Sequence, residues 1–438
     1  MAMSHIHIVP YIHTSNVLVE PLEPNLPAKV LTKKSFYHPL SFGYMYLQKP
    51  FPPVLTLPVL LPREVIIRQP PSTRAEIFRD LKRMPDGELK LINKDIIESQ
   101  SGIFGEVVKR AMKVIFTGQG LVAMSLPVKI FEPRSTMQRI ADNMCYIPTY
   151  MKLANDTKDP VERAKYCITS FISGLCMSPS MRKPFNPYLG ETMEAVYSDG
   201  SKLYMEHTSH HPPISNFFID TVYGATIWGR YEQVASMSTN SMEIIYRGPF
   251  HVRFSDGSKV TMFFPTGVQN GIIFGDRHLK FEKKACYIDE VNKIKGYAEI
   301  GVKVESGKYA GKRADTLAGE IYTYEPSKHK GYGENYKDVY DAFRGKDRVK
   351  KISSIAGSIY DGMEFDGVEY WNFENQQVER AVPIDNPLPS DYRFREDLIW
   401  MEYNNKDQAQ EWKLKLEEIQ RWDRSLRQEA EKKRNKKK

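Results

Sequence analysis

Cysteine is scarce in this chain of 438 residues: there are four, and no two of them form a Cys-x-x-Cys pair. The four are Cys145, Cys167, Cys176 and Cys286. This spacing excludes a dense disulfide framework and the usual zinc motifs, and it is typical of proteins in a reducing compartment. We therefore expect a cytoplasmic protein with no bound metal.

Long apolar runs are missing as well. The most apolar early stretch, residues 54–67, is interrupted by Pro58 and Pro62 and is too short to cross a bilayer. The N-terminus also lacks the basic and then apolar segments that mark a secretory signal. We expect neither a membrane-spanning helix nor secretion.

The common catalytic motifs are absent too, including a Walker loop, Gly-x-Ser-x-Gly and His-Glu-x-x-His. One segment, from Cys176 to Arg182, has the Cys-x5-Arg spacing of cysteine-dependent phosphatases. Such a phosphate loop normally contains glycine and follows a strand, whereas this one contains Pro179, lacks glycine and follows an expected helix. We predict a protein that is not an enzyme and needs no cofactor; a phosphoinositide phosphatase is the least favoured alternative.

The net charge of +8 favours anionic partners. Much of it lies in the closing run 432–438, which lacks the interleaved aromatic residues of nucleic-acid-binding modules. We therefore expect attraction to anionic membrane surfaces and no nucleic-acid binding.

The N-terminal quarter differs in composition from the rest. Residues 1–72 hold 12 of the 28 prolines and are predicted to be disordered, outside the folded body. Residues 73–118 are predicted to be a helical segment, in which the stretch 103–116 is amphipathic. That stretch is either a helix packed on the core or a lid that also touches membrane.

From residue 183 the apolar period changes to two. Asp-Gly pairs at 199–200, 256–257 and 366–367 separate β-rich runs, which is a strong hairpin signal. An antiparallel meander of this length is expected to close, because an open edge invites aggregation.

We predict an α+β fold in which residues 119–384 form a large antiparallel β-barrel with inserted helices and interior space for a lipid. Residues 385–438 are expected to form a C-terminal helical subdomain with a basic tail. Its main helix is predicted over 406–433, where strong helix formers dominate.

The stretch 205–213 (Met-Glu-His-Thr-Ser-His-His-Pro-Pro) is the most unusual in the chain. Its two closing prolines cannot donate to a sheet and stiffen the backbone beside His210 and His211. The two imidazoles are ordinary sheet histidines, metal ligands together with His207, or donors to a phosphate group. The residues alone leave these three interpretations open.

A second unusual run, residues 183–191 (Lys-Pro-Phe-Asn-Pro-Tyr-Leu-Gly-Glu), lies upstream. Lys183 offers a positive charge and Asn186 an amide donor, while Pro184 and Pro187 stiffen the loop. Alone, the run is interpreted as a turn with a solvated lysine. Beside the histidine pair, we interpret it as the second part of a phosphate site.

The last helix places Lys413, Glu417 and Arg421 four residues apart on one face. Taken alone, this spacing favours an exposed ladder of ion pairs.

Residues 209–213 and 183–191 resemble the two signature motifs of the oxysterol-binding protein-related lipid-transfer family. The resemblance covers about residues 118–422 and includes the run 391–395 (Asp-Tyr-Arg-Phe-Arg). The chain departs from the family at His207 and Thr208, where the family has Gln and Val, and at Glu396, where Pro is common.

The resemblance implies a hydrophobic tunnel beneath a lid, with a site for phosphatidylinositol 4-phosphate at its mouth. The implied headgroup ligands are Lys183, Asn186, His210 and His211 for the phosphates, Lys413 and Arg421 for further charge, and Glu417 for the inositol hydroxyls. Leu121 aligns with a residue that contacts acyl chains in the family's phosphatidylserine carriers.

The implied function is exchange of this lipid for sterol or phosphatidylserine between membranes, by a monomer at membrane contact sites such as those of the endoplasmic reticulum or Golgi. The segment 271–275 slightly favours phosphatidylserine. A sensor or scaffold that binds the same headgroup without net transport is the alternative.

Overall fold

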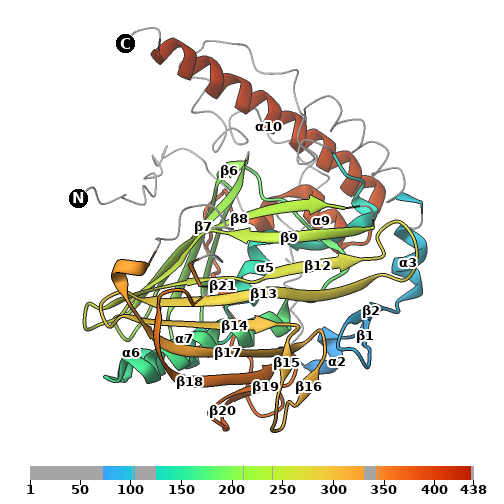
Figure 1. Cartoon of the computed structure of the whole chain (residues 1–438). Helices are drawn as coiled ribbons and strands as arrows, with labels where there is room; N and C mark the ends of the chain where they lie inside the picture. The colour runs from blue at the N-terminus through green and yellow to red at the C-terminus, as the bar shows by residue number, and fades with distance from the viewer. Residues whose placement is uncertain are drawn as a thin grey trace. The chain divides into compact units, whose positions relative to one another are not determined.

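The structure is a computed structural model of the whole chain (Figure 1). It describes residues 73–100, 102–103, 125–210, 212–238, 240–329, 342–343 and 345–435. The chain divides into two compact units, residues 68–420 and a second unit made of 1–67 and 421–438. Three predictions lie outside the described residues: the proline-rich segment 1–72, Leu121, and most of the amphipathic stretch 103–116.

One sheet of 17 strands dominates residues 68–420. Its strands are β1 (Leu81–Arg83), β2 (Leu89–Leu91), β5 (Thr192–Val196), β6 (Lys202–His210), β7 (Pro213–Asp220), β8 (Thr226–Met237), β9 (Ser241–Arg247), β10 (Phe250–Arg253), β11 (Lys259–Phe263), β12 (Thr266–Asn270), β13 (His278–Asp289), β14 (Ile294–Ile300), β17 (Thr316–Tyr324), β18 (Arg348–Ser358), β19 (Gly362–Phe365), β20 (Val368–Asn372) and β21 (Val382–Pro383). Two small sheets pair β3 (Phe131–Ser135) with β4 (Lys183–Phe185) and β15 (Lys303–Val304) with β16 (Gly311–Lys312).

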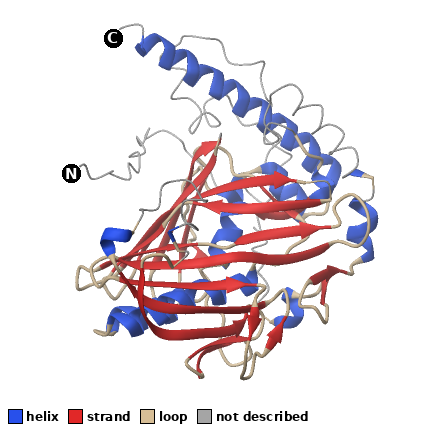
Figure 2. Cartoon of the chain, in the orientation of Figure 1, coloured by secondary structure: helices blue, strands red, loops and turns tan. Residues whose placement is uncertain are grey.

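All pairings within the large sheet are antiparallel. They run from β21 through β5, β6 and β7 to β8, which pairs with both β9 and β10. These two branches rejoin at β13 through β12 and β11, and the sheet continues through β14, β17, β18 and β19 to β20. Figure 2 shows the strands as a curved wall with helices behind it. The α+β fold with a large, barrel-like antiparallel sheet is confirmed; the enclosed tunnel stays a prediction.

The Asp-Gly turns close hairpins as expected. The first joins β5 to β6 and is closed by a hydrogen bond from Tyr197 N to Ser201 O of 2.8 Å. The second joins β10 to β11 in the same way, from Phe254 N to Ser258 O at 2.9 Å. Gly257 has a φ of +84°, a conformation that residues with a Cβ adopt only at a cost. The hairpin predictions are therefore confirmed.

The helices of the structure are α2 (Arg74–Ile77), α3 (Lys94–Gln100), α5 (Thr136–Asp142), α6 (Ile147–Asp156), α7 (Pro160–Gly174), α9 (Glu396–Glu402) and α10 (Lys406–Asn435), with short 3-10 turns η3 (Val128–Ile130), η4 (Leu175–Met177), η5 (Pro326–Lys328) and η6 (Tyr392–Phe394). The side chain of Asp159 caps α7, and Pro160 opens it. α7 packs on β13, β14, β19 and β20, with Phe171 in the aromatic core. Among the described residues, no helix combines the length and apolar character needed to cross a bilayer.

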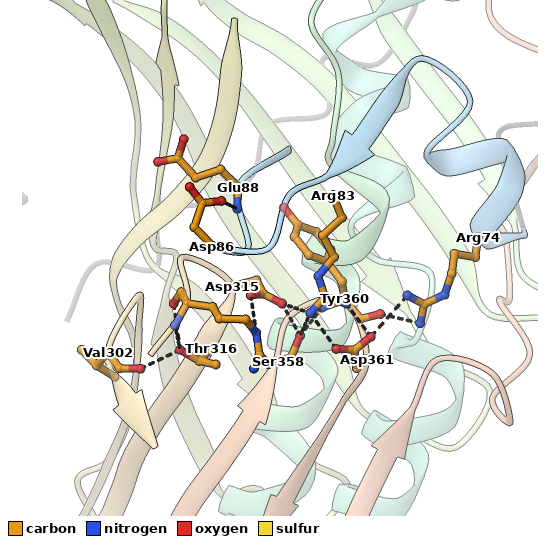
Figure 3. A network of polar contacts seen from close by, with 11 residues as sticks. Arg74, Arg83, Asp86, Glu88, Val302, Asp315, Thr316, Ser358, Tyr360 and Asp361 are labelled. Carbon is orange, nitrogen blue, oxygen red and sulfur yellow. Dashed lines mark hydrogen bonds and ion pairs between the residues drawn. The ribbon is translucent and has the colours of Figure 1, made fainter. Parts of the chain in front are cut away.

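The prediction of a helical segment over residues 73–118 is wrong at Leu81–Leu91, which form the β1–β2 hairpin. β2 also pairs with β13, so this hairpin extends the large sheet. Figure 3 shows Arg83 at the hairpin reaching Asp315 and Asp361. The turn contains Asp86-Gly87, the same hairpin signal as at 199–200, and Gly87 has a φ of +84°; the prediction missed it. Only the pairing of β2 with β13, far along the chain, has no local signal.

Candidate functional site

The run 183–191 lies directly beside strand β6. Gly190 N donates to His207 O at 2.8 Å, and His207 N donates to Glu191 O at 2.9 Å. Gly190 has a φ of +85°, and this backbone conformation turns the loop toward the strand. The two unusual runs of the sequence are therefore joined through their backbones.

Lys183 and Asn186 face each other within this loop. Lys183 Nζ donates to Asn186 Oδ1 at 2.5 Å and to Pro184 O at 3.2 Å, and it lies 4.8 Å from the centre of the Phe131 ring. The interpretation of this run taken alone, as a turn with a solvated lysine, does not fit the structure, because Lys183 is only partly exposed.

Lys413 on α10 approaches the same aromatic ring. Its Nζ lies 5.5 Å from the centre of Phe131, donates to Ser125 Oγ at 2.9 Å and pairs with Glu417. Lys413 is buried, whereas an exposed ion-pair ladder would leave it in solvent. Two of the three predicted helix residues thus lie near the 183–191 loop.

The charges around Lys183 confirm this proximity. Burial, and then the nearby positive charges of Lys413 and Arg395, lower the pKa of Lys183 to about 7, although Glu417 and Glu132 act in the opposite direction. A lysine that titrates near neutrality is poised to gain a proton when an anion arrives. The cluster is therefore suited to a phosphate group.

The histidines form a short hydrogen-bonded series. Ser215 Oγ lies 3.0 Å from His207 Nδ1, and His207 Nε2 lies 3.4 Å from His210 Nδ1. If each group donates to the next, His210 carries its proton on Nε2, the donor form that a phosphate oxygen requires. His211 lies outside the described residues, so its role stays a prediction.

His207 is buried beside His210 and belongs to the same hydrogen-bonded series. Burial, with His210 and Arg395 nearby, lowers the pKa of His207 to about 3, so this ring is neutral at physiological pH. Among the residues described, no three His, Cys, Asp or Glu side chains are grouped as metal ligands. The contact between the His207 and His210 rings was not predicted from the sequence.

Arg395, also missed as a site residue, is bonded to the 183–191 loop. Its Nη1 donates to Asn186 O at 2.9 Å and to Glu191 Oε2 at 3.0 Å. Its Nε and Nη2 both donate to Asp397, each at 2.8 Å. The run 391–395 had been noticed only for its resemblance; nothing in that pattern shows which arginine turns inward.

Arg421 follows Glu417 by one turn of α10 but belongs to the second compact unit. Its contribution to the site therefore stays a prediction.

Comparison with known proteins gives the family. A family model described as "Oxysterol-binding protein" matches residues 110–438. The chain belongs to the oxysterol-binding protein family, a family of lipid-binding domains. It is 30% identical over 357 residues to "Oxysterol-binding protein 9" of Dictyostelium discoideum, covering 79% of this chain and 80% of that relative.

A second relative, "Oxysterol-binding protein homolog 3" of Saccharomyces cerevisiae, is 27% identical over 338 residues, covering 72% of this chain and 31% of the yeast protein. The chain therefore spans most of the Dictyostelium relative but about a third of the yeast one.

Two solved structures share the fold. The "Osh3 ORD in complex with PI(4)P" from S. cerevisiae has a TM-score of 0.56 at 23% identity and covers 73% of this chain and 84% of that one. The "Osh1 ORD domain in complex with cholesterol" has a TM-score of 0.52 at 21% identity, covering 70% and 76%.

The phosphatase-like segment has the wrong environment for its chemistry. Cys176 lies in η4 with 1% of its surface exposed, and burial raises the pKa of its thiol far above the ordinary value. A phosphatase nucleophile needs an accessible thiolate of lowered pKa. Cys176 is thus a core residue packed against Tyr146.

Proposed function

We propose that this chain binds phosphatidylinositol 4-phosphate through Lys183, Asn186, His210, His211, Lys413, Glu417 and Arg421, and exchanges it for a second lipid between membranes. The observation that carries this proposal is the meeting of Lys183 and Lys413 over one ring, beside the loop that is bonded to β6. Two cations, an amide and an imidazole N–H are the donors that a phosphorylated inositol requires.

A carrier for such a lipid needs no covalent step. Enclosing acyl chains in an apolar tunnel regains about 0.8 kcal/mol for each methylene otherwise exposed to water. The charged headgroup keeps its partners at the tunnel mouth, and Leu121 is proposed to contact the acyl chains. Competition between two lipids for one tunnel then gives exchange, driven by the gradient of either lipid.

The second lipid is proposed to be a sterol or phosphatidylserine. Solved structures with the same fold are titled as complexes with cholesterol and with ergosterol, which supports the sterol. Mass spectrometry of lipids that co-purify with the full chain tests this choice.

The test of the function is transfer between vesicles. Donor vesicles carry fluorescently detectable phosphatidylinositol 4-phosphate, and the full chain is added in substoichiometric amount. We expect many lipids moved per protein and loss of transfer in the double variant His210→Ala/His211→Ala. The control is His251→Ala, a histidine on β10 bonded to Thr261 and remote in sequence from both motifs.

A sensor or scaffold gives a different result, because it saturates after binding one lipid per protein. Saturation would replace the carrier proposal by that alternative. Undiminished transfer by the double variant would remove the histidine pair from the site.

A further inference from the structure

Arg395 is bonded to Asn186 and Glu191 of the 183–191 loop and to Asp397, and all three of its guanidinium nitrogens donate to protein oxygens. Its side chain is 5% exposed. A residue so enclosed does not serve as a ligand contact itself.

We propose that Arg395 is the positioning residue of the headgroup site: it fixes the 183–191 loop against strand β6, so that Lys183, Asn186 and His210 reach one anion together. This inference rests on the proposed function and goes beyond it by assigning what holds the site in its binding geometry.

The first connection runs to the loop. Arg395 binds the backbone carbonyl of Asn186, the residue whose side chain accepts from Lys183. It also binds Glu191, whose carboxylate accepts from Tyr188 N at 3.0 Å and from Ser135 Oγ at 3.1 Å. The middle and the end of the loop are therefore fixed from one side chain.

The second connection runs to the histidines. Glu191, held by Arg395, accepts through its backbone carbonyl from His207 N, and the His207 ring contacts His210. A shift of Glu191 therefore shifts His207 and changes where His210 presents its Nε2. This route has two residues between Arg395 and His210.

The hydrogen bonds of this residue require arginine and not merely a positive charge. Nε and Nη2 donate to the two carboxylate oxygens of Asp397, while Nη1 donates to the loop. The rings of Tyr188 and Phe185 lie 4.4 and 5.2 Å from its Cζ. A lysine has one nitrogen and cannot make this planar fork.

Arg395 also sets part of the charge at the site. The charged groups that face Lys183 are Lys413 and Glu417 on α10, Glu132 on β3, and Arg395 before α9. Losing the positive charge of Arg395 shifts the protonation of Lys183 toward higher pH, whereas Arg395→Lys keeps that charge. The two substitutions therefore separate geometry from electrostatics.

The experiment measures binding of the full chain to vesicles of phosphatidylcholine with 5 mol% phosphatidylinositol 4-phosphate, as a function of pH. We expect Arg395→Lys to weaken binding by about 10- to 100-fold, the usual effect of losing a supporting contact, with the pH midpoint unchanged. Arg395→Gln weakens binding similarly and moves the midpoint to higher pH. The matched control is Arg393→Lys, which alters a comparably buried arginine paired with Asp391 in the same segment.

Wild-type affinity and midpoint in both Arg395 variants, or an equal loss in Arg393→Lys, would overturn the proposal. If Arg395→Gln does not fold, Glu191→Gln breaks the same connection from the loop side and must weaken binding as Arg395→Lys does. Wild-type affinity in Glu191→Gln also overturns it.

A ligand-free measurement keeps this inference separate from the proposed function. In NMR spectra of the apo protein at pH 7, the imidazole signals of His207 and His210 must shift in Arg395→Lys and stay in place in Arg393→Lys. Absence of wild-type binding would sink the proposed function, whereas unmoved imidazole signals would sink the positioning role.

Discussion

Lys183 and Lys413 both place their ammonium groups near the ring of Phe131, with Nζ at 4.8 and 5.5 Å from its centre. The charge of Lys413 lowers the pKa of Lys183; Glu417, the partner of Lys413, offsets part of this repulsion, and a bound anion would offset more of it. This repulsion lowers the stability of the ligand-free protein, and binding of an anion relieves it.

Substitution of Lys183 by Met is therefore expected to separate binding from stability. Loss of a charge-assisted hydrogen bond lowers affinity for phosphatidylinositol 4-phosphate by about 1.5–3 kcal/mol, roughly 10- to 150-fold. The melting temperature stays unchanged or rises, because a partly buried cation is removed. Vesicle binding and differential scanning fluorimetry measure both quantities.

The control for that variant is Lys415→Met, which removes a lysine of α10 that pairs with Glu411 instead of facing Phe131. It is expected to bind like wild type. A fall in melting temperature of Lys183→Met with unchanged binding would contradict the role of Lys183.

Binding is expected to weaken as pH rises above about 7. The pKa of Lys183 is about 7 in the ligand-free protein, and an anion raises it, so binding takes up a proton at higher pH. Between pH 7.5 and 9 the phosphate monoester is already ionised, which isolates the lysine. Affinity should fall by up to about tenfold per pH unit there, and Lys183→Met should abolish the slope.

The stability of the ligand-free protein has the opposite pH dependence. The pKa of Lys183 is lower in the folded than in the unfolded chain, so the unfolded chain binds more protons between about pH 7 and the ordinary lysine pKa. The cost of burying Lys183 is complete below about pH 7 and disappears as pH rises through that window. Urea unfolding should show a larger gain in the free energy of unfolding from pH 7 to pH 9 for wild type than for Lys183→Met.

Cys176 is expected to carry no catalytic role. Incubation of the full chain with phosphatidylinositol 4-phosphate should release inorganic phosphate at the background rate, for wild type and for Cys176→Ser alike. The substitution should lower the melting temperature, because a buried hydroxyl replaces a thiol in the core. Phosphate release that disappears in Cys176→Ser would restore the phosphatase hypothesis.

Lys295 supplies a stability test away from the site. Its side chain is fully buried and pairs with Asp347, while its Nζ also donates to Ala342 O at 2.8 Å. Asp347→Asn leaves this cation without its counter-charge and is expected to cost about 3–5 kcal/mol. Chemical denaturation measures the loss, and the compensating double variant Lys295→Met/Asp347→Leu should recover most of it.

Much of this molecule was predictable from local signals. The Asp-Gly turns, the capped helix that begins at Pro160 and the terminal helix from Lys406 all follow from short-range chemistry, and each is present. The runs 183–191 and 205–213 were also recognisable from the sequence, because their residue combinations are rare.

Other features depend on partners far along the chain. The β2 strand of the hairpin also pairs with β13, and Arg395 is bonded to Asn186 and Glu191, which lie far earlier in the chain. Asp86-Gly87 signals the β1–β2 turn, but no spacing within residues 81–91 or 391–397 reveals these distant partners. The surroundings of His207 likewise depend on Ser215, which faces it across the β6–β7 hairpin.

The β1–β2 hairpin has a practical consequence for anyone expressing a shortened protein. The family match starts at residue 110, after this hairpin. A fragment begun there would lack Arg83, leaving the fully enclosed Asp315 without one of its two cations, and would uncover backbone groups of β13 at Leu279. Such a fragment should precipitate more readily than one begun at Thr73, whose extra residues complete the edge of the sheet.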